Sequence, residues 1–206
     1  MCKENFKTAV ILAGGKSSRM GFDKQFLEIG EVRIMEKLIQ ELRKEFDDIV
    51  VVTNKKREYE EDGFRVISDE IKGVGPLSGI HIGLKESKSK YTYFIACDMP
   101  NISLKYIRYM KKVLLENKYD ACVAKIDDKV EPFNSFYSKD ILPKIESLIN
   151  KDKRSMFGLI NIIETLFIEK NILEKYNYDF DMFINLNSKE DLEMYNKRNR
   201  LEEKNV

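Results

Sequence analysis

Apolar residues in the first 126 positions follow two alternating patterns. Continuous apolar runs predict strands covered on both faces of a parallel sheet, and they lie at Lys7–Ala13, Asp48–Asn54, Phe64–Asp69, Tyr91–Ala96 and Tyr119–Ile126. Between them, apolar positions recur every three or four residues and predict amphipathic helices at Arg33–Phe46, Leu77–Glu86 and Ser103–Lys118. This alternation predicts a parallel sheet with helices on both faces.

The second part of the chain is less regular. It predicts strands at Pro132–Ser138, Ile163–Glu169 and Phe183–Asn187, and helices at Asp140–Asn150, interrupted near Pro143, and at Ser155–Ile163. The last helix begins with Ser188 as N-cap and Asp191 three residues on, a variant of the capping box. No repeat or linker divides the chain, so we expect one α/β domain over 1–206 with a frayed tail at 199–206.

Composition narrows the classes of partner. The 206 residues fit one domain, and 36 basic against 35 acidic residues argue against nucleic-acid binding, which requires a clearly basic domain. Three cysteines without a CxxC pair indicate neither a disulfide framework nor a zinc site. Because no apolar run approaches about 20 residues, we expect no membrane span and a soluble protein of the cytoplasm.

The segment VILAGGKSSRMGFDK predicts an anion site at the end of the first strand. In an open parallel sheet, ligands bind outside the carboxyl ends of the strands. Gly14 and Gly15 allow the backbone N–H groups to approach phosphate oxygens, and Lys16, Arg19 and Lys24 would neutralise the remaining charge. The alternative is a glycine-rich turn with surface lysines.

Two known phosphate-binding patterns do not fit this segment. A P-loop requires a further glycine five residues before the glycine of Gly-Lys-Ser. In this chain that glycine is Gly15, and Val10 stands five residues before it. The dinucleotide pattern GxGxxG also fails, because Gly14 and Gly15 are adjacent. The segment is therefore a motif of its own.

Two aspartates and one glycine-rich turn lie at the same predicted edge. Asp98 ends an apolar strand, where a carboxylate is costly unless it is compensated, and Mg²⁺ prefers one or two carboxylates plus substrate phosphates; the alternative, a cap of the next helix, suits Ser103 better. Asp69 would bind a ribose or base, or would stabilise a turn. Gly75–Gly79 would recognise a base edge, or would form a plain turn into a helix. His81 is expected to be packed or solvent-facing.

These residues together resemble the molybdenum cofactor guanylyltransferases, the MobA-like nucleotidyltransferases. The resemblance covers nearly the whole chain and rests on LAGGKSSRMGFDK, on the Ser-Asp pair at 68–69, on GPLSGI, on CDMP and on FINLNSKEDL. It implies a Rossmann-like three-layer sandwich of the nucleotide-diphospho-sugar transferase type. It also implies a nucleotide-binding part at about 7–126 and an acceptor-binding part at about 127–198.

The resemblance implies transfer of GMP from Mg-GTP to the terminal phosphate of molybdopterin, with release of pyrophosphate. Nucleotide contacts would come from Leu12, Ala13, Gly14, Lys24 and Asp69, with Gly75, Pro76, Leu77 and Gly79 beside the guanine, and Asp98 would hold magnesium. Arg19 would bind the triphosphate. The acceptor would meet Arg154, Ser155, Asn185 and Asn187, whereas Glu131 stands where the family usually has a basic residue. A monomer, a GTP-binding adaptor and contacts with a molybdoenzyme or its chaperone are also expected.

Two other functions remain open from the sequence. One is a nucleotidyltransferase of the same fold that acts on a sugar phosphate or an alcohol phosphate, or a cytidylyltransferase acting on molybdopterin. The other is a non-catalytic nucleotide-binding module, against which the joint presence of Lys16, Arg19, Lys24 and Asp98 argues.

Overall fold

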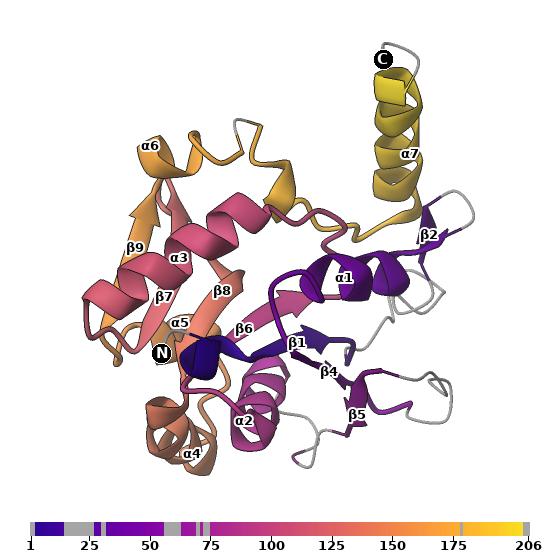
Figure 1. The fold of residues 1–206 in the computed structure, drawn as a ribbon. Helices are drawn as coiled ribbons and strands as arrows, with labels where there is room; N and C mark the ends of the chain where they lie inside the picture. Colours follow the sequence, from indigo (N-terminus) through magenta and orange to yellow (C-terminus); the bar gives the residue numbers. More distant parts are fainter. Residues whose placement is uncertain are drawn as a thin grey trace.

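The central sheet has seven strands in the order β5-β4-β1-β6-β8-β7-β9 (Figure 1). The computed structural model describes residues 3–14, 27–29, 32–55, 63–68, 71, 75–177 and 179–203. The strands are β1 (Thr8–Leu12), β4 (Asp48–Val52), β5 (Arg65–Ile67), β6 (Tyr91–Ala96), β7 (Ala121–Ile126), β8 (Lys129–Ser138) and β9 (Thr165–Glu169), beside a separate hairpin of β2 (Glu28–Ile29) and β3 (Val32–Arg33). β8 is antiparallel to β6 and β7, and the other pairings of the large sheet are parallel.

Helices cover both faces of the sheet (Figure 1). They are α1 (Ile34–Leu42), α2 (Pro76–Glu86), α3 (Leu104–Glu116), α4 (Leu142–Asn150), α5 (Met156–Ile160), α6 (Lys170–Leu173) and α7 (Lys189–Glu203), with short 3-10 turns at Lys3–Phe6, Lys139–Ile141 and Asp181–Phe183. In β1, Ala9 and Ile11 pack in the core beneath α1 and α3, whereas Val10 packs in the core beneath α2 and α4. Burial on both faces explains why these strands read as continuous apolar runs.

The predicted mostly parallel sheet is confirmed, and two local features refine it. β8 begins at Lys129 and not at Pro132, because Asp127 with φ of 53° turns the chain directly from β7 into an antiparallel partner. The helix expected at Asp140–Asn150 begins as α4 at Leu142. Pro143 lies in its first turn, where a missing N–H costs no hydrogen bond.

The strand expected at Phe183–Asn187 is wrong. Phe183 ends a 3-10 turn, and the described chain continues to Ser188 without regular structure. Its backbone groups find other partners: the amide of Leu186 donates to the carbonyl of Asp98 at 2.9 Å, and the amide of Asn187 donates to Oδ2 of Asp191 at 2.8 Å. Apolar–polar alternation therefore marks a half-buried extended segment here, without a neighbouring strand.

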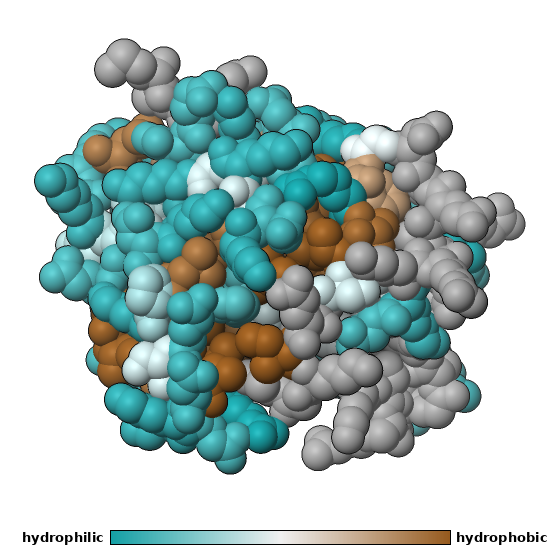
Figure 2. Space-filling view, turned by 90° about the horizontal axis from the view of Figure 1, so that it is seen from below, coloured by the Kyte–Doolittle hydropathy of each residue, from teal (hydrophilic) through white to brown (hydrophobic). Residues whose placement is uncertain are grey.

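The capping box of the last helix is confirmed. The amide of Asp191 donates to Oγ of Ser188 at 3.0 Å, and the amide of Ser188 donates to Oδ2 of Asp191 at 2.8 Å. α7 runs to Glu203, into the segment where we expected a frayed tail. Seen from the side of α2 and α4, the described surface is mainly hydrophilic with separate apolar patches (Figure 2). Within the described residues, no helix has both the length and the apolar composition that a membrane crossing needs.

Candidate functional site

The carboxyl ends of β1, β4 and β6 lie side by side at one edge of the sheet. Leu12 pairs with Val52 on one side and with Ala96 on the other. The ladder continues beyond the strands, because the amide of Ala13 donates to the carbonyl of Val52 at 2.9 Å and the amide of Cys97 donates to the carbonyl of Leu12 at 3.1 Å. Gly14 and Asp98, one residue further along each chain, therefore lie at the same edge.

Gly14 is exposed at this edge, and the packing of the described protein does not require a glycine there. A Cβ at position 14 would have the carbonyl of Val52 as its nearest contact, at an ordinary 3.9 Å. Gly14 also does not have a positive φ angle, whereas Gly75 has a φ of +74°. Gly14 thus leaves open backbone beside the end of β1.

α2 begins at the same edge and runs back along the sheet. A Cβ at Gly79 would lie 2.9 Å from Cδ2 of Leu12, and one at Gly83 would lie 3.2 Å from Cγ1 of Val10, so the helix proceeds toward the strand starts. Its first turn, at Pro76 and Leu77, is consequently directed to the edge, where the positive end of the helix dipole favours an anion or an electron-rich base edge. His81 is packed as expected: it is 7% exposed, with Nε2 3.1 Å from Oε1 of Glu146.

Asp98 follows β6, and its Oδ1 atom is shielded from solvent. Its carbonyl accepts the hydrogen bond from Leu186, so the extended segment with Asn185 and Asn187 lies directly beside it. Both amide side chains also bind this segment: Nδ2 of Asn185 donates to the carbonyl of Phe183 at 3.0 Å, and Nδ2 of Asn187 donates to the carbonyl of Asn185 at 3.5 Å. The fold thus brings the expected metal residue and two expected acceptor residues together.

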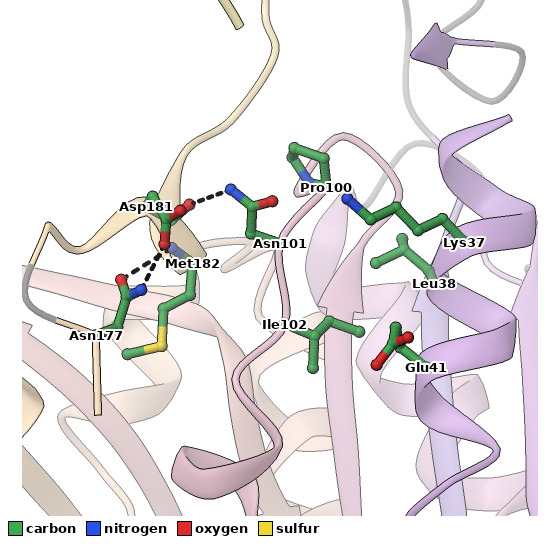
Figure 3. A pocket seen from close by; sticks show the side chains of 9 residues that line it. All are labelled: Lys37, Leu38, Glu41, Pro100, Asn101, Ile102, Asn177, Asp181 and Met182. Atoms are coloured by element: carbon green, nitrogen blue, oxygen red, sulfur yellow. Dashed lines mark hydrogen bonds between the residues drawn. The ribbon is translucent and has the colours of Figure 1, made fainter. Parts of the chain in front are cut away.

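A pocket of about 260 Å³ lies beneath this contact, between α1 and the chain around Asn101 and Asp181 (Figure 3). Its walls are Lys37, Leu38, Glu41, Pro100, Asn101, Ile102, Asn177, Asp181 and Met182. Nδ2 of Asn101 donates to the carbonyl of Asp181 at 3.2 Å across its rim, and Nδ2 of Asn177 donates to Oδ1 of Asp181 at 2.5 Å. Polar groups therefore surround a partly apolar floor.

The other expected site residues make different contacts or lie outside the described residues. Arg154 pairs with Asp152 at 2.6 Å, and Oγ of Ser155 accepts from the amide of Gly158 at 3.3 Å as the N-cap of α5; neither contact reaches Asp98. The side chain of Glu131 is 9% exposed and pairs with Lys129 at 2.5 Å. Gly15, Lys16, Arg19, Lys24 and Asp69 lie outside the described residues.

Four polar residues, in two hydrogen-bonded pairs, escaped the sequence analysis. Oη of Tyr195 donates to Oδ1 of Asn101 at 2.6 Å, and the phenol of Tyr93 donates to the amide oxygen of Asn134. Burial raises the pKa of the Tyr93 phenol, which keeps it a hydrogen-bond donor. Asn101 directly follows Cys-Asp-Met-Pro, which was a usable signal; nothing local marks Tyr195 or Asn134, whose partners are 94 and 41 residues away.

Asp98 is the described residue that could hold a metal ion at this edge. Within the described part of the chain, no three His, Cys, Asp or Glu side chains converge on a point that would hold a metal ion. Asp98 supplies one carboxylate at the ligand edge, which matches the way Mg²⁺ binds through one or two carboxylates and substrate phosphates.

Known proteins are similar to this chain in sequence, and a solved structure has the same fold. The model of the MobA-like NTP transferase domain matches residues 9–164. A protein of Syntrophotalea carbinolica named molybdenum cofactor guanylyltransferase is 45% identical over 94% of this chain and 92% of its own length. One of Peptoclostridium acidaminophilum, named "probable molybdenum cofactor guanylyltransferase", is 41% identical over 100% and 97%. The solved molybdopterin-guanine dinucleotide biosynthesis protein A of Archaeoglobus fulgidus shares the fold, with a TM-score of 0.80, 22% identity and coverage of 92% and 97%.

Proposed function

Because the chain belongs to the family of MobA-like NTP transferases and is a nucleotidyltransferase, we propose that it transfers GMP from GTP to the terminal phosphate of molybdopterin. The observation that carries this proposal is the shared edge: the backbone of Leu12–Gly14, the start of α2 and Asp98 lie at one edge of the sheet. The names of the two relatives support guanine as the base and a molybdenum cofactor as the product.

The reaction joins two phosphates and needs little proton transfer. An oxygen of the acceptor phosphate attacks the α-phosphorus of GTP, the bond from that phosphorus to the bridging oxygen breaks, and pyrophosphate leaves with the electron pair. A phosphate monoester has its second pKa near 6, so the attacking oxygen is already anionic at neutral pH. A general base is therefore unnecessary, which suits a chain with a single histidine.

The protein's contribution is to align two anions and to offset their repulsion. The backbone of Leu12, Ala13, Gly14 and Gly15 would hold phosphate oxygens, and Lys16, Arg19 and Lys24 would balance the charge of the triphosphate. Asp69 and the turn at Gly75–Gly79 would bind the ribose and the guanine. Mg²⁺, held by Asp98, would neutralise phosphate charge when bound. Asn185 and Asn187, beside Asp98, would contact the acceptor.

The test is transfer by the purified protein. With Mg-GTP and molybdopterin we expect a guanine dinucleotide by mass spectrometry and an equal amount of pyrophosphate, and Asp98→Ala and Lys24→Ala should abolish both while the circular dichroism spectrum stays unchanged. Near wild-type transfer by either variant would contradict its role. Thermal protection by Mg-CTP or Mg-UTP in preference to Mg-GTP would overturn the base assignment, because only a ligand of the native state raises the melting temperature.

Some implications of the resemblance remain predictions beside this proposal. They are the adaptor protein, the contacts with a molybdoenzyme or its chaperone, the monomeric state and the cytoplasmic location. Affinity capture with each purified candidate would test the adaptor and the molybdoenzyme or chaperone contacts, and sedimentation of the protein alone would test the monomeric state.

A further inference from the structure

The chain returns from α6 to fasten itself to the turn that carries Asp98. Asn101 is the centre of this attachment: its Oδ1 accepts from the phenol of Tyr195 in α7 at 2.6 Å, and its Nδ2 donates to the carbonyl of Asp181 at 3.2 Å. The amide of Leu186 donates to the carbonyl of Asp98 itself at 2.9 Å. Tyr195 is 6% exposed, and the bond from its phenol is partly buried.

We propose that Asn101 and Tyr195 are positioning residues that hold the carboxylate of Asp98 and the segment of Asn185 in one relative geometry. The inference rests on the proposed function, in which the first holds the metal and the second contacts the acceptor. Asn101 is three residues from Asp98, so their Cα atoms are at most about 11 Å apart, and Pro100 restricts the backbone between them. We therefore expect a displacement at Asn101 to alter the orientation of the Asp98 carboxylate.

The fold around the turn has other supports, which separates this role from general stability. The amide of Met99 donates to the carbonyl of Ala96 at 3.1 Å, and Oγ of Ser103 caps α3 by accepting from the amide of Tyr106 at 3.2 Å. The end of β6 and the start of α3 are thus fixed without Asn101. What Asn101 adds is the link to the C-terminal segment.

Packing holds the apolar side chains of this segment, because Met182, Phe183 and Leu186 are buried in the core, but it leaves a space beside Asn101. The 260 Å³ pocket opens between α1 and this attachment, with Asn101 and Asp181 on its rim (Figure 3). Close-packed side chains resist displacement by ångström fractions, whereas a segment beside an open space relies on its hydrogen bonds for position. An error of about 1 Å in the alignment of reacting groups can cost about a hundredfold in rate.

The test compares two buried tyrosines of the same core, of which one is bonded to Asn101 and the other lies far from Asp98. Tyr195→Phe removes the bond to Asn101, and Tyr91→Phe removes a phenol bond of similar length, 3.0 Å to the carbonyl of Tyr119, at the opposite end of β6. We expect Tyr195→Phe to lower kcat for GMP transfer about tenfold and to raise KM for molybdopterin and for Mg-GTP several-fold. Tyr91→Phe should leave all three unchanged.

A second readout does not depend on transfer. Binding of Mn²⁺ to the protein with GTP, followed by electron paramagnetic resonance, should weaken several-fold in Tyr195→Phe and in Asn101→Ala, and the double variant should lose no more than Asn101→Ala alone. Wild-type kcat and Mn²⁺ affinity in Tyr195→Phe, or equal losses in Tyr91→Phe, would overturn the positioning role. A wild-type protein that transfers no GMP would overturn the proposed function, and the Mn²⁺ comparison would then decide the role of Tyr195 by itself.

Discussion

One carboxylate joins the starts of three parallel strands, and we predict that Asp48→Asn destabilises the fold without weakening nucleotide binding. Asp48, 9% exposed at the start of β4, accepts hydrogen bonds from Nε and Nη2 of Arg65 at 2.8 and 2.7 Å. It also accepts one from Oγ1 of Thr8 at 2.9 Å. Arg65 begins β5 and Thr8 begins β1. The substitution therefore acts on the end of the sheet opposite to Gly14 and Asp98.

The magnitude follows from burial. Removing one partner of a buried ion pair costs about 3–5 kcal/mol. Arg65 is 31% exposed and keeps a hydrogen bond of 2.9 Å to the carbonyl of Glu86, so water and this bond reduce the loss to about 2–3 kcal/mol. For a domain of this length the melting temperature should fall by about 5–10 °C. Leu12 lies about 13 Å along β1 from Thr8, so the Kd for GTP should not change.

The measurement is urea unfolding at several pH values, with Asp152→Asn as the control. Burial alone would raise the pKa of Asp48, but the hydrogen bonds from Arg65 and Thr8 and the nearby positive charges outweigh it, and the pKa lies below its ordinary value. The resulting stability is present above the unfolded pKa of about 3.9 and is lost as pH falls through the folded pKa. The gap between wild type and Asp48→Asn should therefore be full at pH 7 and should close below about pH 4.

In the control, the carboxylate of Asp152 pairs with Arg154 at 2.6 Å, but the Asp152 side chain is 81% exposed. Asp152→Asn should therefore lower the free energy of unfolding by no more than about 0.5 kcal/mol. Equal stability of Asp48→Asn and wild type at pH 7 would refute the reasoning, and so would a gap that persists undiminished at pH 3.

Two further pairs of substitutions test the core by thermal unfolding. The phenol of Tyr106 is buried without a hydrogen-bond partner among the described residues, so Tyr106→Phe should leave stability unchanged or raise it by about 1 kcal/mol. Tyr93→Phe leaves the buried amide oxygen of Asn134 unsatisfied and should cost about 1–3 kcal/mol. A loss of stability in Tyr106→Phe, or no loss in Tyr93→Phe, would contradict this. A Cβ at Gly83 would lie 2.6 Å from the buried ring of Phe94, so Gly83→Val should cost about 2–3 kcal/mol. At Gly158 a Cβ meets nothing nearer than 3.6 Å, so Gly158→Ala should stabilise by up to about 1 kcal/mol, and a lower melting temperature would be the contrary result.

The strands that sequence predicted correctly are those whose environment is symmetric. Residues 9–12, 49–52 and 93–96 are apolar throughout because helices cover both faces, and a run of that kind is visible in any single sequence. The direction of β8 was less visible. Its hairpin with β7 depends on Asp127 in a left-handed conformation, and Asp-Asp is a weaker hairpin signal than Asn-Gly or Asp-Gly.

The candidate site likewise has one part that the sequence predicted and one part that it did not. The position of Asp98 beside Leu12–Gly14 follows from parallel strand order, because the ends of neighbouring parallel strands meet at one edge. The attachment of the C-terminal segment did not follow, since its bonds connect Asn101 with Tyr195, 94 residues away, and Leu186 with Asp98. Periodicity describes a residue's own element and carries no information on such partners.

This division has an energetic consequence for the evolution of specificity. Register fixes the nucleotide side: Leu12 is held by ladders to β4 and β6, and a slip by one residue would turn every side chain to the opposite face. Core packing of Leu186 and a few single hydrogen bonds, each worth about 1 kcal/mol, hold the proposed acceptor segment. We therefore expect substitution of Asn101 or Tyr195 to shift this segment while the domain stays folded. On the proposed function, such substitutions should alter recognition of the acceptor without changing the strand register behind the nucleotide edge.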